Sequence, residues 1–143
     1  MSKSLKGKFR RNIDTKGRLI IPSKLRIDDT KALVISRGLD NCLYIYTEDE
    51  WDVFMNKLEE LGDKNDIRKL KRYFAANAED IDMDDQGRIV VPSEYRDQVK
   101  IDKEVVVVGN INRIEIWSAP VWDELEETPE FSTEYISQIF ENI

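Results

Sequence analysis

Two arginines carry the clearest chemistry that this sequence of 143 residues offers. Arg18 and Arg88 each follow an aspartate by four positions and a glycine by one. A guanidinium group donates hydrogen bonds in a planar fork, which fits phosphate oxygens and also the O6 and N7 atoms of guanine in the DNA major groove. Each arginine could instead form an ion pair with the aspartate before it, Asp14 or Asp84, and hold a turn closed.

The two arginines lie in a motif that occurs twice, at residues 14–26 and at residues 84–96. The copies are identical at six of thirteen positions and share the pattern D-x-x-G-R, three apolar residues, P-S-x, one apolar residue and R. Aspartate can accept backbone N–H groups across a tight turn, and glycine supplies the positive φ that such a turn usually needs. The residues expected to structure these turns are Asp14, Gly17, Asp84 and Gly87.

The rest of each motif predicts a short strand followed by one turn of helix. The three apolar residues after each arginine are typical of a well-buried strand, which Pro22 or Pro92 would end. Ser23 and Ser93 then stand where they can cap a short helix. Each unit is therefore expected to run strand, turn, strand, helical turn.

The segments after the motifs are also informative: S-R-G-L-D-N-C-L at residues 36–43 and N-R-I-E-I-W at residues 112–117. Together with the two motifs, they make the chain resemble the MraZ family over nearly all of residues 5–125. The resemblance implies a bacterial transcriptional regulator with two AbrB-like DNA-binding half-motifs per chain, assembled into a ring. It also implies that Arg18 and Arg88 bind DNA, at short G-rich direct repeats in the promoter of the division and cell-wall gene cluster.

Further cations are expected to assist Arg18. Lys16 lies within the same turn, and an alternation of period two at residues 5–13 predicts a strand whose outer side carries Lys8 and Arg10. These two side chains could contact phosphates, or they could protect an edge strand from aggregation.

The second motif carries fewer cations than the first. Gln86 stands where the first motif has Lys16, and Glu94 stands where it has Lys24. We therefore expect the first half of the chain to bind DNA more strongly.

The internal repeat limits which folds are possible. Each half has about 65 residues, which is too few for a comfortable core, so the halves are expected to share one. The expected fold class is α+β, with two pseudo-symmetric AbrB-like half-repeats forming one small mixed barrel-like domain with flanking helices. The expected division is a first half at 5–61, a linking helix at 62–77, a second half at 78–125 and an acidic C-terminal tail or helix at 126–143.

Helical periodicity appears at four places. A helix at 48–61 is expected to bury one face, linking-helix periodicity begins near residue 67, and Ser118 precedes a third helix. Residues 135–140 are typical of a short amphipathic helix, whose apolar face could pack on the body or on a neighbouring chain. The expected buried face of the first helix consists of Trp51, Phe54, Met55, Leu58 and Leu61, and residues 28–31 are expected to form a loop.

Charge is distributed unevenly along the chain. The net charge is −7, yet residues 1–26 carry nine Lys or Arg and one Asp, and residues 65–77 carry four Lys or Arg and one Asp. Residues 105–143 carry one Arg and eight acidic residues. This uneven distribution of charge favours one basic surface that binds polyanions over a uniformly charged surface.

The composition gives little support to an enzyme. The sequence has no histidine, so the usual general base and the commonest zinc ligand are missing. An acidic cluster at residues 80–85 lacks a glycine-rich phosphate loop, and Cys42, the single cysteine, is expected to be a buried thiol. We expect no catalysis, cofactor or metal.

The expected partners are double-stranded DNA and further copies of the chain, with no small-molecule substrate. No apolar run approaches about 20 residues, so we expect no membrane contact and a cytoplasmic, nucleoid-associated protein. The alternatives are an antitoxin-like module that binds a basic toxin, a non-catalytic ring scaffold, or a metal-dependent enzyme acting on nucleotides.

Overall fold

Both halves of the chain run through the same order of elements in a computed structural model that describes residues 3–27 and 30–143. The first half comprises β1 (Leu5–Asn12), β2 (Arg18–Ile20), the 3-10 helix η1 (Ser23–Leu25), β3 (Ala32–Arg37), β4 (Leu43–Thr47) and α1 (Glu48–Leu58). Helix α2 (Lys64–Ala76) follows. The second half comprises β5 (Ala78–Asp82), β6 (Arg88–Val90), α3 (Ser93–Gln98), β7 (Glu104–Ile111), β8 (Arg113–Ser118) and α4 (Ala119–Glu127). The chain continues through η2 (Pro129–Phe131) and α5 (Thr133–Glu141).

The two halves exchange strands. Six strands form one antiparallel sheet in the order β1-β7-β8-β4-β3-β5, and β2 pairs with β6 in a separate two-stranded ribbon. Strand β1 of the first half therefore pairs with β7 of the second, and β5 of the second pairs with β3 of the first. Each half lacks a complete sheet without the other, so the expected shared core follows from the topology.

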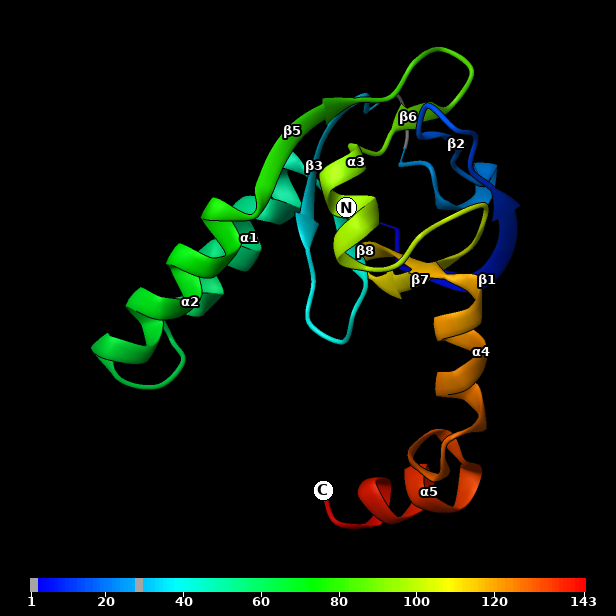
Figure 1. The fold of residues 1–143 in the computed structure, drawn as a ribbon. Coiled ribbons are helices and arrows are strands. Elements are labelled where there is room, and N and C mark those ends of the chain that lie inside the picture. The colour runs from blue at the N-terminus through cyan, green and yellow to red at the C-terminus, as the bar shows by residue number, and fades with distance from the viewer. Residues whose placement is uncertain (1–2, 28–29) are drawn as a thin grey trace.

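The fold is α+β, as expected, but its large sheet is open. Among the described residues no pairing joins β1 to β5, the two outer strands of the sheet, so the expected barrel does not close. The ribbon β2–β6 and its short helices instead cover one face of the sheet. Helices α1, α2 and α4 lie on the other face (Figure 1).

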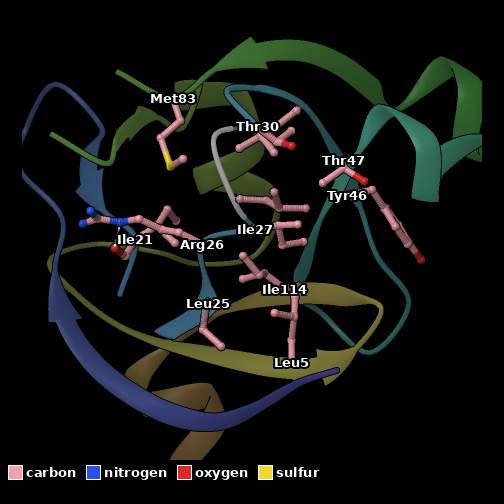
Figure 2. Close-up of a pocket in the computed structure, with 12 residues that line it drawn as sticks. Leu5, Ile21, Leu25, Arg26, Ile27, Thr30, Tyr46, Thr47, Met83 and Ile114 are labelled. Atoms are coloured by element: carbon pink, nitrogen blue, oxygen red, sulfur yellow. Dashed lines mark hydrogen bonds between the residues drawn. The ribbon is translucent and has the colours of Figure 1, made fainter. Parts of the chain in front are cut away.

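Period-two alternation in the central strands supplies a core on each face of the sheet. In β4, Leu43 and Ile45 face the ribbon, whereas Tyr44 and Tyr46 face the helices. Figure 2 shows a small cavity in the core beneath the ribbon, with Leu5, Ile27 and Ile114 in its mostly apolar lining. Its volume of about 20 Å³ leaves room for roughly one water molecule. This face is therefore a packed core rather than a ligand site.

Buried polar groups join the two halves on the helix-covered face. Arg113 of β8 lies over the ring of Tyr44 with its Cζ 3.9 Å from the ring centroid, and its Nη2 donates to Glu115 at 2.9 Å. Trp117 Nε1 donates to the other oxygen of Glu115 at 3.1 Å. Burial raises the pKa of Tyr44 to about 12. The charged pair is thus hydrogen-bonded on both sides, which a buried carboxylate requires.

The helix boundaries differ from the expected ones at two places. Helix α1 ends at Leu58 rather than at residue 61, so Leu61 is 51% exposed and does not belong to the buried face. Helix α2 begins at Lys64 rather than near 67, because Asp63 accepts the backbone N–H of Asp66 and caps it. Of the expected loop at 28–31, residues 28 and 29 lie outside the described residues.

The expected serine caps are absent. Pro22 and Pro92 occupy the N-cap positions of η1 and α3, and neither short helix has a side-chain cap hydrogen bond. Ser23 and Ser93 are instead the first helical residues, because proline ends the strand and its fixed φ leads into the helix. Cys42 is buried, as expected.

Candidate nucleic-acid interface

The turn of the first motif is built on one carboxylate. Asp14 Oδ1 accepts the backbone N–H groups of Lys16 at 3.0 Å and Arg18 at 2.8 Å, while Oδ2 accepts Nε of Arg18 at 2.6 Å. Gly17 has a φ of 84° and donates its N–H to the carbonyl of Asp14. The backbone and side-chain hydrogen bonds from Arg18 lower the pKa of Asp14.

The turn of the second motif has the same hydrogen bonds. Asp84 accepts the backbone N–H groups of Gln86 at 2.9 Å and Arg88 at 2.8 Å, and it accepts Nε of Arg88 at 2.8 Å. Gly87 has a φ of 81°. The hydrogen bonds from Arg88 lower the pKa of Asp84 in the same way. In both turns, therefore, the arginine forms an ion pair with the aspartate through one nitrogen only.

The last arginine of each motif braces the turn of the other motif. Arg26 donates Nε to the carbonyl of Ile21 at 2.9 Å and Nη2 to the carbonyl of Gln86 at 3.4 Å (Figure 2 draws the bond to Ile21). Arg96 likewise donates to the carbonyls of Val91 at 3.0 Å and Thr15 at 3.5 Å. The two turns are consequently held in fixed relation to each other.

The ribbon β2–β6 places both motif arginines on one face. Arg18 pairs with Val90, and Ile20 pairs with Arg88, so these four side chains share the outer face of the ribbon. Leu19 and Ile89 pair on the inner face and are almost fully buried. Figure 1 shows β2 and β6 side by side, at the same end of the molecule.

The apolar triplets are not buried throughout, contrary to expectation. Ile20 is 51% exposed and Val90 is 52% exposed, because each is the middle residue between two inward-facing ones. Both residues were missed as candidate site residues. The period-two alternation of a strand could have identified them, but three consecutive apolar residues conceal that period.

Arg18 and Arg88 line one surface pocket together with Asn12, Ile13, Asp14 and Ile20. Both arginine side chains are about half exposed, at 50% and 42%. Their Nη1 and Nη2 atoms have no hydrogen-bond partner among the described residues. The pocket therefore presents two guanidinium groups, each of which keeps its terminal N–H donors for a ligand.

The other expected cations lie in two places. Lys16 is exposed within the first turn, beside Arg18. Lys8 and Arg10 project from β1 toward α4, where they form ion pairs with Glu126 and Asp123. Lys16 is thus next to the arginine pocket, whereas Lys8 and Arg10 are engaged by the acidic helix.

The structure also bears on metal binding and on membrane insertion. Within 3–27 and 30–143, no three His, Cys, Asp or Glu side chains are grouped so that they could hold a metal ion. In the same part of the chain, no helix has the length and apolarity needed to cross a membrane.

Comparison with known proteins identifies the family. The sequence matches the family described as "MraZ protein, putative antitoxin-like" twice, over residues 5–72 and 74–138. It is 42% identical over 139 residues to the transcriptional regulator MraZ of Caldanaerobacter subterraneus subsp. tengcongensis, covering 96% of this chain and 97% of the relative. It is 41% identical over 133 residues to the protein of the same name from Natranaerobius thermophilus, covering 92% and 93%. The name of these relatives is that of a regulator rather than an enzyme, in agreement with the expectation from composition. The chain therefore belongs to the MraZ family.

Proposed function

We propose that this chain is a sequence-specific DNA-binding transcriptional regulator, and that it reads DNA with the outer face of the β2–β6 ribbon. The observation that carries the proposal is the placement of Arg18 and Arg88 in one pocket with their terminal N–H donors unpaired among the described residues. A two-stranded ribbon fits the major groove of B-DNA, where arginine pairs with O6 and N7 of guanine.

The aspartates orient the arginines in this proposal. Asp14 and Asp84 each take one N–H of the guanidinium, which fixes the plane of the group and points its remaining donors outward. Lys16 adds a phosphate contact beside Arg18. Ile20 and Val90 lie next to the arginines on the same face and suit contact with thymine methyl groups. Lys8 and Arg10 would reach phosphate only if their ion pairs with α4 open.

The two AbrB-like halves act as one reading unit in this proposal. The exchanged strands and the crossed contacts of Arg26 and Arg96 support a division in which 5–61 and 78–125 are interlocked through 62–77, with 126–143 as a tail. The family resemblance supplies the proposed target, which is a set of short direct repeats in the promoter of the division and cell-wall gene cluster. A ring of copies would engage several repeats at once, from a high effective concentration.

The decisive experiment measures binding to a labelled fragment from upstream of the protein's own operon, titrated with salt. Arg18→Ala should reduce specific affinity at least about 100-fold, since one bidentate guanine contact is worth about 1–3 kcal/mol and recurs in every copy. Arg88→Ala should weaken binding less. Arg68→Ala on α2 removes the same charge away from the ribbon and should leave specific binding nearly unchanged. Unaltered affinity of a folded Arg18→Ala variant would refute the proposal.

A second candidate is an antitoxin-like module, which the wording of the family description favours. In that case the acidic C-terminal tail would bind a small basic protein. Affinity capture from the source cells distinguishes the two, because a stoichiometric basic partner is expected only for the antitoxin. A ring scaffold would show neither specific DNA binding nor such a partner.

A further inference from the structure

Helix α5 is amphipathic but packs on almost nothing. All residues of α5 are exposed, and within residues 3–27 and 30–143 the only element with which it shares substantial contact is η2 beside it. Its apolar side chains, spaced to form one helix face, are Tyr135, Ile136, Ile139 and Phe140. Phe140 is 79% exposed. Four large apolar side chains on one exposed face of a short helix are typical of a surface that is covered by a partner.

A second uncovered apolar surface lies on the opposite arm of the molecule. A groove between α2 and the segments that follow β3 and α1 is lined mainly by Leu39, Leu61, Leu70 and Tyr73. Leu39 and Leu61 are 53% and 51% exposed. Tyr73 fixes one wall of the groove, because its hydroxyl donates to the carbonyl of Gly38 at 3.0 Å. The groove is therefore preformed rather than a product of loop flexibility.

The two surfaces are complementary in charge as well as in polarity. Lys69 and Asp66 both line the groove, but helix α2 as a whole carries five Lys or Arg and one Asp, so this arm is basic. The segment from α4 to α5 carries Glu and Asp but no Lys or Arg after Arg113. Surfaces of opposite charge orient two partners and accelerate their association.

We propose that α5 of one copy docks in the α2 groove of a second copy, head to tail. The inference deepens the homo-oligomer of the proposed function and rests on it. Figure 1 shows the α4–α5 arm and the α1–α2 arm extending from the sheet in different directions, so each copy offers both surfaces at once. Such an unlike pair repeats from copy to copy, and it closes into a ring when the rotation permits.

The contact is small, so a stable assembly depends on closure of the ring. One short helix in a groove covers less than the roughly 800 Å² per partner of a standard interface, so a single contact would be weak. In a closed ring every copy makes the contact twice, and the last contact forms within the assembly.

Paired variants test the interface by multi-angle light scattering on the full chain. Ile139→Glu on α5 and Leu61→Glu in the groove should each reduce the assembly to single chains of 16.8 kDa. The matched controls add the same charge elsewhere on the same elements or beside them: Gln138→Glu on the polar face of α5, and Asn56→Glu on the exposed side of α1. Both controls should keep the wild-type mass.

Mixing the two defective variants separates head-to-tail docking from every symmetric arrangement. Ile139→Glu retains a sound groove and Leu61→Glu retains a sound α5, so the mixture can form one contact per pair of chains. At concentrations well above those at which the wild type assembles, it should yield a species of two chains that grows no further. If α5 instead packs against α5, Leu61→Glu alone will assemble normally, and the proposal is overturned. A wild-type protein that is a single chain would overturn it too, as would a mixture that stays monomeric even at concentrations high enough for one weak contact to form.

A crosslinking measurement checks the contact directly. Since the only cysteine, Cys42, is buried, Leu61→Cys with Ile139→Cys introduces the accessible thiols. A short bifunctional thiol reagent should link the double variant into a ladder of chains and leave both single variants unlinked. Linking of Ile139→Cys alone would show an α5–α5 contact and contradict the proposal.

The DNA readout keeps the two proposals apart. Ile139→Glu and Leu61→Glu should still bind a single repeat as weakly as the isolated wild-type unit does, while losing the gain from several repeats. Loss of DNA binding by Arg18→Ala with an intact assembly concerns the ribbon alone. Normal DNA binding with an unchanged mass in both interface variants would refute the interface without affecting the ribbon.

Discussion

The two arginine turns share one backbone design but differ in charge. Their aspartate-to-backbone hydrogen bonds agree within 0.1 Å, and their glycines have φ values of 84° and 81°. The side chains around them differ, with Lys16 in the first turn and Gln86 in the second. The second turn also carries Asp85, which forms an ion pair with Lys31, where the first has Thr15. Any inequality in DNA binding should therefore arise from charge rather than from turn geometry.

The glycines distinguish the turns most strongly. A Cβ on Gly17 would collide with the backbone carbonyl of Val91, whereas a Cβ on Gly87 would meet the movable guanidinium of Arg26. Gly87→Ala should cost about 1–2 kcal/mol for its positive φ, and Gly17→Ala should cost clearly more because a backbone must shift. Urea unfolding of both variants measures this difference. Equal losses of stability would mean that the carbonyl of Val91 moves as easily as the guanidinium group of Arg26.

Exchange of Lys16 and Gln86 between the two turns should have a smaller effect, and it should act on DNA affinity. Lys16→Gln should weaken DNA binding roughly fivefold and flatten the salt dependence by about 0.9 per lost phosphate contact. Gln86→Lys should do the reverse. The double exchange should restore nearly wild-type affinity if the turns differ in DNA binding only through residues 16 and 86. Titration of all three variants at several salt concentrations provides the measurement, and failure of the double exchange would show that a further difference between the turns, such as Asp85 in place of Thr15, also affects binding.

The exposed apolar pair should have a smaller effect, confined to sequence preference. Replacing thymine by uracil beside the contacted guanines removes one methyl group, which should cost the wild type roughly fourfold in affinity at about 0.8 kcal/mol per group. Ile20→Ala combined with Val90→Ala should abolish that discrimination while retaining the arginine contacts. Unchanged discrimination in the double variant would place the thymine contact elsewhere.

The smallest effect concerns acid stability. The pKa values of Asp14 and Asp84 are lowered in the folded chain, so their hydrogen bonds stabilise it fully above the ordinary aspartate pKa of about 4. That contribution is lost as the pH falls through the lower folded-state values. The double variant Asp14→Asn with Asp84→Asn lacks these two titrating groups. It should therefore lose less stability than the wild type as the pH falls from about 5 through the range in which carboxylates titrate. Unfolding midpoints across this range test it, and parallel curves would contradict it.

The repeat and the spacing of its residues already determined much of the local design. An aspartate, a glycine and an arginine within five residues need only neighbouring backbone groups to form a hydrogen-bonded turn, so the sequence contains the necessary information. The α+β class and the shared core followed from element order and from the small size of each half. The family could be inferred because the motif occurs twice at a fixed separation.

Tertiary structure alone decided which segments meet. The choice of β7 as the partner of β1 and the contact of Arg26 with the turn at Gln86 join residues far apart in sequence. No local pattern specifies such partners, because many strands and carbonyls could satisfy the same hydrogen bonds. The exposure of Ile20 likewise depends on which face of the ribbon meets the core, since three consecutive apolar residues suit either face. The engagement of Lys8 and Arg10 depends on where α4 packs, which the charge of β1 alone could not determine.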